Sequence, residues 1–178
     1  CDRAHEKGML LYPSLIVQSN NAVKGEGTVW VRVSDWRFNA GHLEIGASGN
    51  LDPSHPAFQL LDFKHKEVQD TRFAIIEEVV NNYPVDGFEL QLTASDFFHP
   101  DEIDSGRGIM TEWIRRVHEA VKKSGSSREL VISVLGNIET CDSKGLDLNE
   151  WIRQGIVDVL NVAIGMTYQV DQMGDFRP

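Results

Sequence analysis

The stretch Val85-Asp86-Gly87-Phe88-Glu89-Leu90-Gln91-Leu92 decides the fold, because a helical pattern lies on each side of it. Its length and apolar content predict a buried β-strand. Before it, apolar residues at helical spacing over 66–82 predict a helix that Pro84 ends. After it, the same spacing predicts a helix over 103–124. A strand between two helices indicates the α/β class.

The same alternation continues toward both ends of the chain. Apolar runs predict strands at 9–17, 130–136 and 157–165, and a short helix is expected around 148–153. Helices that connect successive strands require the strands to run parallel. An open doubly wound sheet and a (β/α)8 barrel both fit this order. No G-x-G-x-x-G or Walker pattern follows a strand, so we expect parallel (β/α) units, most consistent with a partial TIM (β/α)8 barrel.

The length of the chain bears on its domain organisation. A (β/α)8 barrel needs about 250 residues and eight strands, and these 178 residues carry about half of the strands. The first residues have the pattern of a helix stopped by Gly8, with no initiator Met. We therefore expect residues 1–178 to be a fragment of a single barrel. The segment 18–60 has no sustained helical period, apart from a possible short strand at 28–33, and predicts a long loop at the active face that is either ligand-binding or partly ordered.

Composition excludes several classes of function. With 41% hydrophobic and 25% charged residues, the chain has the composition of an ordinary globular domain. The net charge of −10 argues against a nucleic-acid partner, and no apolar run is long enough to predict a membrane-spanning segment. Two cysteines and six histidines without ligand spacing predict no disulfide framework, no metal site and no cofactor. The localisation and the oligomeric state stay open.

The predicted strand 85–92 carries the strongest candidates for a functional site. Side chains alternate between the two faces of a strand, so Glu89 and Gln91 share the face opposite Phe88 and Leu90. The apolar set must face the helices, which turns Glu89 and Gln91 into the barrel. A buried carboxylate is costly unless it is paired or used. Glu89 is therefore a general acid or base, a carboxylate that holds a ligand, or a group with a tuned pKa; the alternative is a glutamate tied to a neighbouring Lys or Arg inside the barrel.

Other polar residues follow the predicted strands, where the sites of parallel α/β proteins lie. Asn20 and Asn21 have amides suited to sugar hydroxyls, although such residues also form turns. His99 is a candidate for substrate contact, with a structural or solvated role as the alternative. Glu139 could join Glu89 as the second carboxylate of a glycosidase pair, or be a solvated loop acid.

Three segments resemble uncharacterised glycosyl-hydrolase-like (β/α)8-barrel proteins. The stretch LDFKHKEVQD at 61–70 is similar to the family's LDF-x-H-P-E-V-R-D, and VDGFEL at 85–90 is similar to VDGIELDF or VDGIHLDY. The stretch GLDLNEWIRQGIVD at 145–158 looks like GLDV-x-x-W-x-x-x-G-L-VD. The similarity extends more loosely from Ala4 to about Gly165. The resemblance implies a carbohydrate-active barrel that cleaves O-glycosidic bonds of a poly- or oligosaccharide.

The chain departs from that family at one informative position. Many relatives have an acidic residue two positions after the one occupied by Glu89, whereas this chain has Gln91. An amide cannot form the glycosyl ester of a retaining mechanism. Three hypotheses remain open: a glycoside hydrolase with Glu89 as its central carboxylate and Gln91 orienting the substrate, a non-catalytic carbohydrate-binding barrel, and an isomerase or lyase that uses Glu89 as a base.

Overall fold

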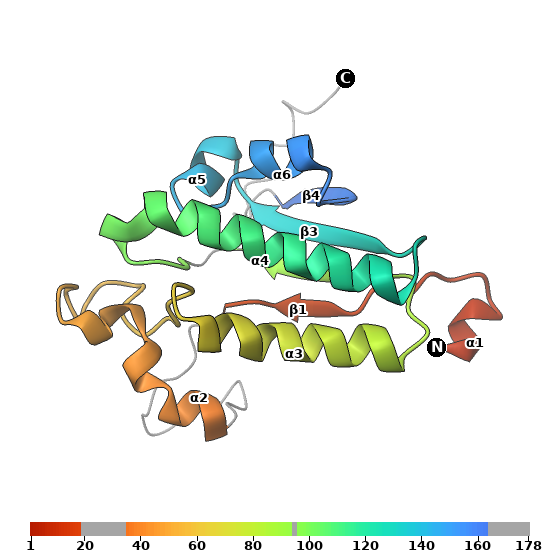
Figure 1. The fold of residues 1–178 in the computed structure, drawn as a ribbon, viewed down its shortest axis with the longest axis horizontal. Coiled ribbons are helices and arrows are strands. Elements are labelled where there is room, and N and C mark those ends of the chain that lie inside the picture. The colour runs from red at the N-terminus through yellow and green to blue at the C-terminus, as the bar shows by residue number, and fades with distance from the viewer. Residues whose placement is uncertain (19–34, 94–95, 164–178) are drawn as a thin grey trace, which may run out of the picture.

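A computed structural model describes residues 1–18, 35–93 and 96–163 (Figure 1). Within them, one parallel sheet has the strand order β1-β2-β3-β4, and its strands are Ser14–Ile16, Gly87–Leu92, Glu129–Leu135 and Val159–Ala163. Strands that are consecutive along the chain are therefore neighbours in the sheet. The predicted α/β class with parallel (β/α) units is confirmed. The possible strand at 28–33 lies outside the described residues.

Strand β1 is shorter than the apolar run 9–17 that predicted it. Met9 and Leu10 are 53% and 68% exposed, so hydrophobicity at that end does not correspond to burial. Pro13 has no N–H with which to extend the ladder, although its carbonyl accepts a bond from the Glu89 N–H at 2.8 Å. The apolar composition therefore overestimated the length of the strand, although this segment does pair with β2.

The main helices lie where the helical spacing predicts them. Helix α3 is Lys66–Asn82, α4 is Ile103–Ser124, and α6, Leu148–Gln154, ends one residue later than expected. Helix α1, Asp2–His5, precedes Gly8, whose φ of 70° gives the helix end predicted there.

Short elements also occur where loops are predicted. Helix α5, Ile138–Asp142, follows β3 and is capped by Asn137, whose side chain accepts a bond from the Thr140 N–H at 2.9 Å. The predicted loop 18–60 includes α2, Asp35–Asn39, and the 3-10 turns η1, Gly41–Leu43, and η2, Ile45–Ser48. A third 3-10 turn, η3, is Pro100–Glu102. Ile45, Ala57 and Leu60, all within this predicted loop, form a small buried hydrophobic cluster of their own.

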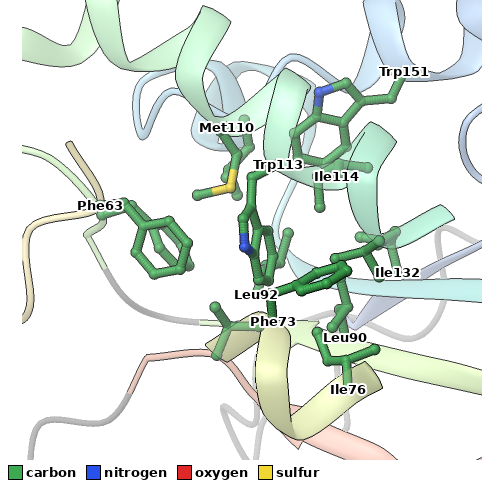
Figure 2. Close-up of a cluster of buried hydrophobic side chains, with 14 of the residues drawn as sticks. Phe63, Phe73, Ile76, Leu90, Leu92, Met110, Trp113, Ile114, Ile132 and Trp151 are labelled. Atoms are coloured by element: carbon green, nitrogen blue, oxygen red, sulfur yellow. The ribbon is translucent and has the colours of Figure 1, made fainter. Parts of the chain in front are cut away.

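The main core lies between the sheet and its helices (Figure 2). Trp113 of α4 lies edge-on to Phe63 at a ring-centroid distance of 5.2 Å. Trp151 of α6 is fully buried and donates its indole N–H to the Thr111 hydroxyl at 2.9 Å, so its polar atom is satisfied inside the core. The first contact packs α4 against the segment that precedes α3, and the second joins α6 to α4.

Within the part of the chain that the structure describes, helices cover one face of the sheet. Figure 1 shows α3 and α4 running across the same side of the strands. Consecutive parallel strands without a reversal of order place their right-handed crossover helices on one side, whereas a doubly wound sheet reverses its order and is covered on both. Accordingly Phe88, Leu90 and Leu92 are at most 2% exposed, while Glu89 and Gln91 are only half-buried on the other face.

The described helices include none that is long and apolar enough to cross a bilayer.

Candidate functional site

The face opposite the helices carries two rows of side chains, set by the strand register. In parallel strands, residues in register point to the same side. One row contains Ser14, Glu89, Val131 and Val159; the next row toward the carboxyl ends contains Ile16, Gln91, Ser133 and Asn161. The register thus gathers hydroxyls and amides from four strands around a single carboxylate.

Glu89 lies at the centre of this polar group. The Ser133 hydroxyl donates to Oε1 of Glu89 at 2.5 Å, and Nδ2 of Asn161 donates to Oγ of Ser133 at 3.2 Å. The hydrogen bond from Ser133 lowers the pKa of Glu89 below its usual value; partial burial opposes this, and the neighbouring Ser14 hydroxyl and Gln91 amide add to the lowering. Glu89 is therefore a carboxylate at neutral pH.

The partners of Glu89 are neutral. Its interactions within the described residues are with hydroxyl and amide groups, and the ion pairs formed by these residues do not include it. The alternative in which Glu89 is tied to a neighbouring Lys or Arg therefore does not describe this part of the chain. A carboxylate held by neutral donors keeps its negative charge available to a ligand.

Tyr12 and Glu129 lie one row further toward the amino-terminal ends of the strands. The Tyr12 hydroxyl donates to Oε2 of Glu129 at 2.5 Å, and this bond, with burial, raises the pKa of Tyr12 to about 12. The Tyr12 ring lies over Gly87, where a Cβ would be 2.3 Å from the ring. The tyrosine therefore fills the space that a side chain at position 87 would need.

Two residues that follow the strands have structural partners. Gln18 is buried and donates through Nε2 to the carbonyls of Leu61 at 2.7 Å and Asp96 at 3.1 Å, so it fastens the end of β1 to two loops. The Asp96 carboxylate pairs with Lys144 at 2.7 Å. Both side chains therefore stabilise the carboxyl-terminal edge of the sheet.

His99 has a structural role in its own turn. Its Nδ1 accepts a bond from the Asp101 N–H at 3.2 Å, which caps η3, and the side chain is buried. Its hydrogen bonds and its ion pair within the described residues are with that turn and not with Glu89. This geometry favours the structural alternative for His99 over the predicted contact with substrate.

Glu139 is not brought to Glu89 either. It lies on the first turn of α5 with an exposed side chain, and among the described residues its carboxylate makes no hydrogen bond or ion pair. This is the solvated acid that was the alternative for this position. Asn20 and Asn21 lie outside the described residues.

Ser133 and Asn161 are the site residues that sequence reasoning missed. Ser133 is a single polar residue inside the apolar run 130–136, and alternation sets it on the face opposite Leu130 and Ile132. That signal was present in the sequence. The contact with Glu89 was not, because it depends on the register between β2 and β3.

The described residues contain no group of three or more His, Cys, Asp or Glu side chains that could hold a metal ion. Comparison with protein-family models finds no match for this sequence, and a search among curated proteins finds none either. For the described residues, fold and site together define a class of protein: a parallel α/β protein with helices packed on one face of its sheet and a hydrogen-bonded glutamate on the opposite face.

Proposed function

We propose that the chain is part of a glycosyl-hydrolase-like TIM (β/α)8 barrel that cleaves O-glycosidic bonds of a poly- or oligosaccharide. Glu89 is the central catalytic carboxylate in this proposal, and Gln91 orients the substrate. The observation that carries the proposal is the ionised Glu89 among neutral polar groups on the face of the sheet opposite the described helices.

The one-sided sheet supports a barrel. In a (β/α)8 barrel, consecutive parallel strands are neighbours, helices cover the outside, and inward-facing side chains alternate with outward-facing ones. The order β1-β2-β3-β4 has this arrangement, and β1 and β4 each pair with one strand within the described residues. The motif resemblance at 61–70, 85–90 and 145–158 agrees with it.

The chemistry of the polar group suits a sugar. Carbohydrate hydroxyls both donate and accept hydrogen bonds, and an amide such as Gln91 can accept through its oxygen and donate through its nitrogen. A carboxylate can stabilise the oxocarbenium-like transition state of glycoside cleavage, attack the anomeric carbon, or activate a water. In the proposal Asn20 and Asn21 add further amides to the sugar cleft, from the segment 18–60.

A second candidate function is non-catalytic carbohydrate binding. Gln91 favours it, because an amide stands where the resembling family often has an acid. The groups that act on the pKa of Glu89 also include no second carboxyl group from the described residues. A carboxylate among hydroxyls and amides can hold a sugar without breaking a bond.

The test is a glycan-cleavage assay on the full-length protein and its Glu89→Gln variant. The substitution keeps the shape of the side chain and removes its charge. We expect the wild type to release product from at least one poly- or oligosaccharide in a panel, and the variant to lose that activity. The matched control is Glu78→Gln, an exposed glutamate on α3. Equal turnover by wild type and Glu89→Gln contradicts the role of Glu89.

The same panel separates the two candidates. Glycan binding by wild type without any product in mass spectrometry favours the binding barrel, and product formation eliminates it. Turnover of a substrate that has no glycosidic bond, lost in Glu89→Gln, favours the isomerase or lyase hypothesis instead.

A further inference from the structure

Three side chains form a row of hydrogen bonds across β2, β3 and β4. Nδ2 of Asn161 lies 3.2 Å from Oγ of Ser133, and that Oγ lies 2.5 Å from Oε1 of Glu89. Ser133 is only 4% exposed, so its hydroxyl depends on these two partners. The row starts on the outermost of the three strands and ends at the proposed catalytic carboxylate.

The chemistry of the three groups fixes the direction of the row. An ionised carboxylate only accepts, and an amide nitrogen only donates. Ser133 therefore gives its single hydroxyl proton to Glu89 and accepts the Asn161 N–H on a lone pair. The opposite orientation would point the hydroxyl proton at an N–H group. Asn161 thus favours the orientation in which the Ser133 hydroxyl donates its hydrogen bond to Glu89.

We propose that Ser133 and Asn161 are positioning residues that fix the Glu89 carboxylate in one orientation and reserve it for the anionic role in the reaction. This inference rests on the proposed function for its consequence in catalysis, while the geometry that carries it is independent of any substrate. Glu89 then serves as nucleophile, base or electrostatic stabiliser, and the proton for the leaving oxygen comes from a different acid.

The surroundings of Glu89 support this assignment. Ser14 of β1 and Gln91 of β2, which lie in the same two rows, also lower the pKa of Glu89. Among the described residues, the titratable strand groups nearest on this face are Tyr12 and Glu129, one row toward the amino-terminal ends, and they bond to each other. Neither is among the groups that shift the pKa of Glu89, and Ser133 makes the largest contribution. The carboxylate is therefore maintained by hydrogen bonds rather than by a cation.

The test measures the ionisation of Glu89 directly, by NMR titration of glutamate carboxyl carbons in the full-length protein, with Glu89→Gln identifying the resonance. We expect Ser133→Ala to raise the pKa of Glu89 more than Ser14→Ala does, because Ser133 is its strongest donor. Ser133→Thr keeps a hydroxyl and should restore the wild-type titration. Asn161→Ala should raise the pKa by less, since it only frees the Ser133 hydroxyl to rotate.

Ser105→Ala is the matched control, because this exposed serine bonds only the Glu102 carbonyl in its own turn and should leave the titration unchanged. Where a glycan is cleaved, the acidic limb of kcat/KM should move to higher pH in Ser133→Ala, with kcat reduced more than KM is changed. A Glu89 titration that is the same in wild type, Ser133→Ala and Asn161→Ala overturns the inference. If Ser133→Ala does not fold, Asn161→Ala at the outer strand decides in the same way. Failure to cleave any glycan contradicts the proposed function but not the role of Ser133 and Asn161 in orienting Glu89, because the titration needs no substrate.

Discussion

Replacing Gly87 with Ala tests the packing beneath the site. A Cβ at position 87 would be 2.3 Å from Cε1 of Tyr12 and 2.4 Å from the carbonyl oxygen of Glu129. Real Cβ atoms do not approach other heavy atoms so closely. The tyrosine ring can rotate away, but the Glu129 carbonyl belongs to the backbone of a central strand and cannot move without disturbing the ladder between β2 and β3.

The expected cost follows from these contacts. Overpacking a well-packed site costs about 1–3 kcal/mol. The matched control is Gly108→Ala in α4, where a Cβ would meet nothing within 4 Å and alanine should stabilise the helix by about 0.5–1 kcal/mol. The two variants should therefore differ by about 1.5–4 kcal/mol in the free energy of unfolding.

Urea denaturation of the full-length protein measures that difference, with the Tyr12→Ala/Gly87→Ala double variant as a second check. Removing the ring relieves one of the two close contacts. Gly87→Ala should therefore lower the free energy of unfolding less in the Tyr12→Ala background than in the wild type, but it should still lower it. If Gly87→Ala unfolds at the same urea concentration as the wild type, then the close approach of Tyr12 and Glu129 to position 87 is wrong. Complete recovery in the double variant would assign the whole cost to the ring instead of the carbonyl.

Two further predictions concern ionisable groups at the amino-terminal ends of the strands. Burial opposes ionisation of Asp158, but the Lys122 ammonium and the Leu130 N–H hold its pKa below the usual value. Its carboxylate therefore contributes stability above the unfolded-state pKa of about 3.9, and this stability is lost as the pH falls through the lower folded value. Asp158→Asn should flatten the acid side of a plot of unfolding free energy against pH. The pKa of Tyr12 is raised to about 12, so ultraviolet titration should find one tyrosine ionising well above pH 10, and that signal should disappear in Tyr12→Phe. An unchanged acid limb in the first case, or no late tyrosine in the second, contradicts the respective hydrogen bond.

The long helices and the class of fold were predictable because their signals are local. The apolar spacing of α3 and its stop at Pro84 are read within one segment, and α4 is equally regular. Helix α5 has too few residues for a period, and its start depends on a single cap by Asn137. Strand β1 was overestimated because Met9 and Leu10 are apolar but exposed.

The site was predictable only in part, for a similar reason. Alternation along β2 gives the face on which Glu89 and Gln91 lie. Ser133, which bonds Glu89, and Asn161, which bonds Ser133, come from other strands, and their approach depends on a register that no local pattern encodes. His99 could have been recognised as a cap, because Pro100 follows it directly at the start of a turn.

Two aspartates explain why the amino-terminal ends of the strands are fixed. Asp86 precedes β2 and accepts the Leu11 N–H at 2.7 Å, while Asp158 precedes β4 and accepts the Leu130 N–H at 2.8 Å. Each aspartate also donates its own N–H to the carbonyl of the same leucine. Each carboxylate therefore links the start of its strand to the neighbouring chain segment.

These two aspartates and the Tyr12–Glu129 pair have structural partners at the amino-terminal ends of the strands. The next rows differ in chemistry: Glu89 there is held by hydroxyls and amides that can exchange a partner for a ligand hydroxyl. Along the strands, side chains with structural partners therefore lie at the amino-terminal ends, and the Glu89 carboxylate lies nearer the carboxyl-terminal ends. In parallel α/β proteins ligands bind at the carboxyl ends of the strands, and the direction found here agrees with a ligand that approaches Glu89 from the row of Gln91 and Asn161.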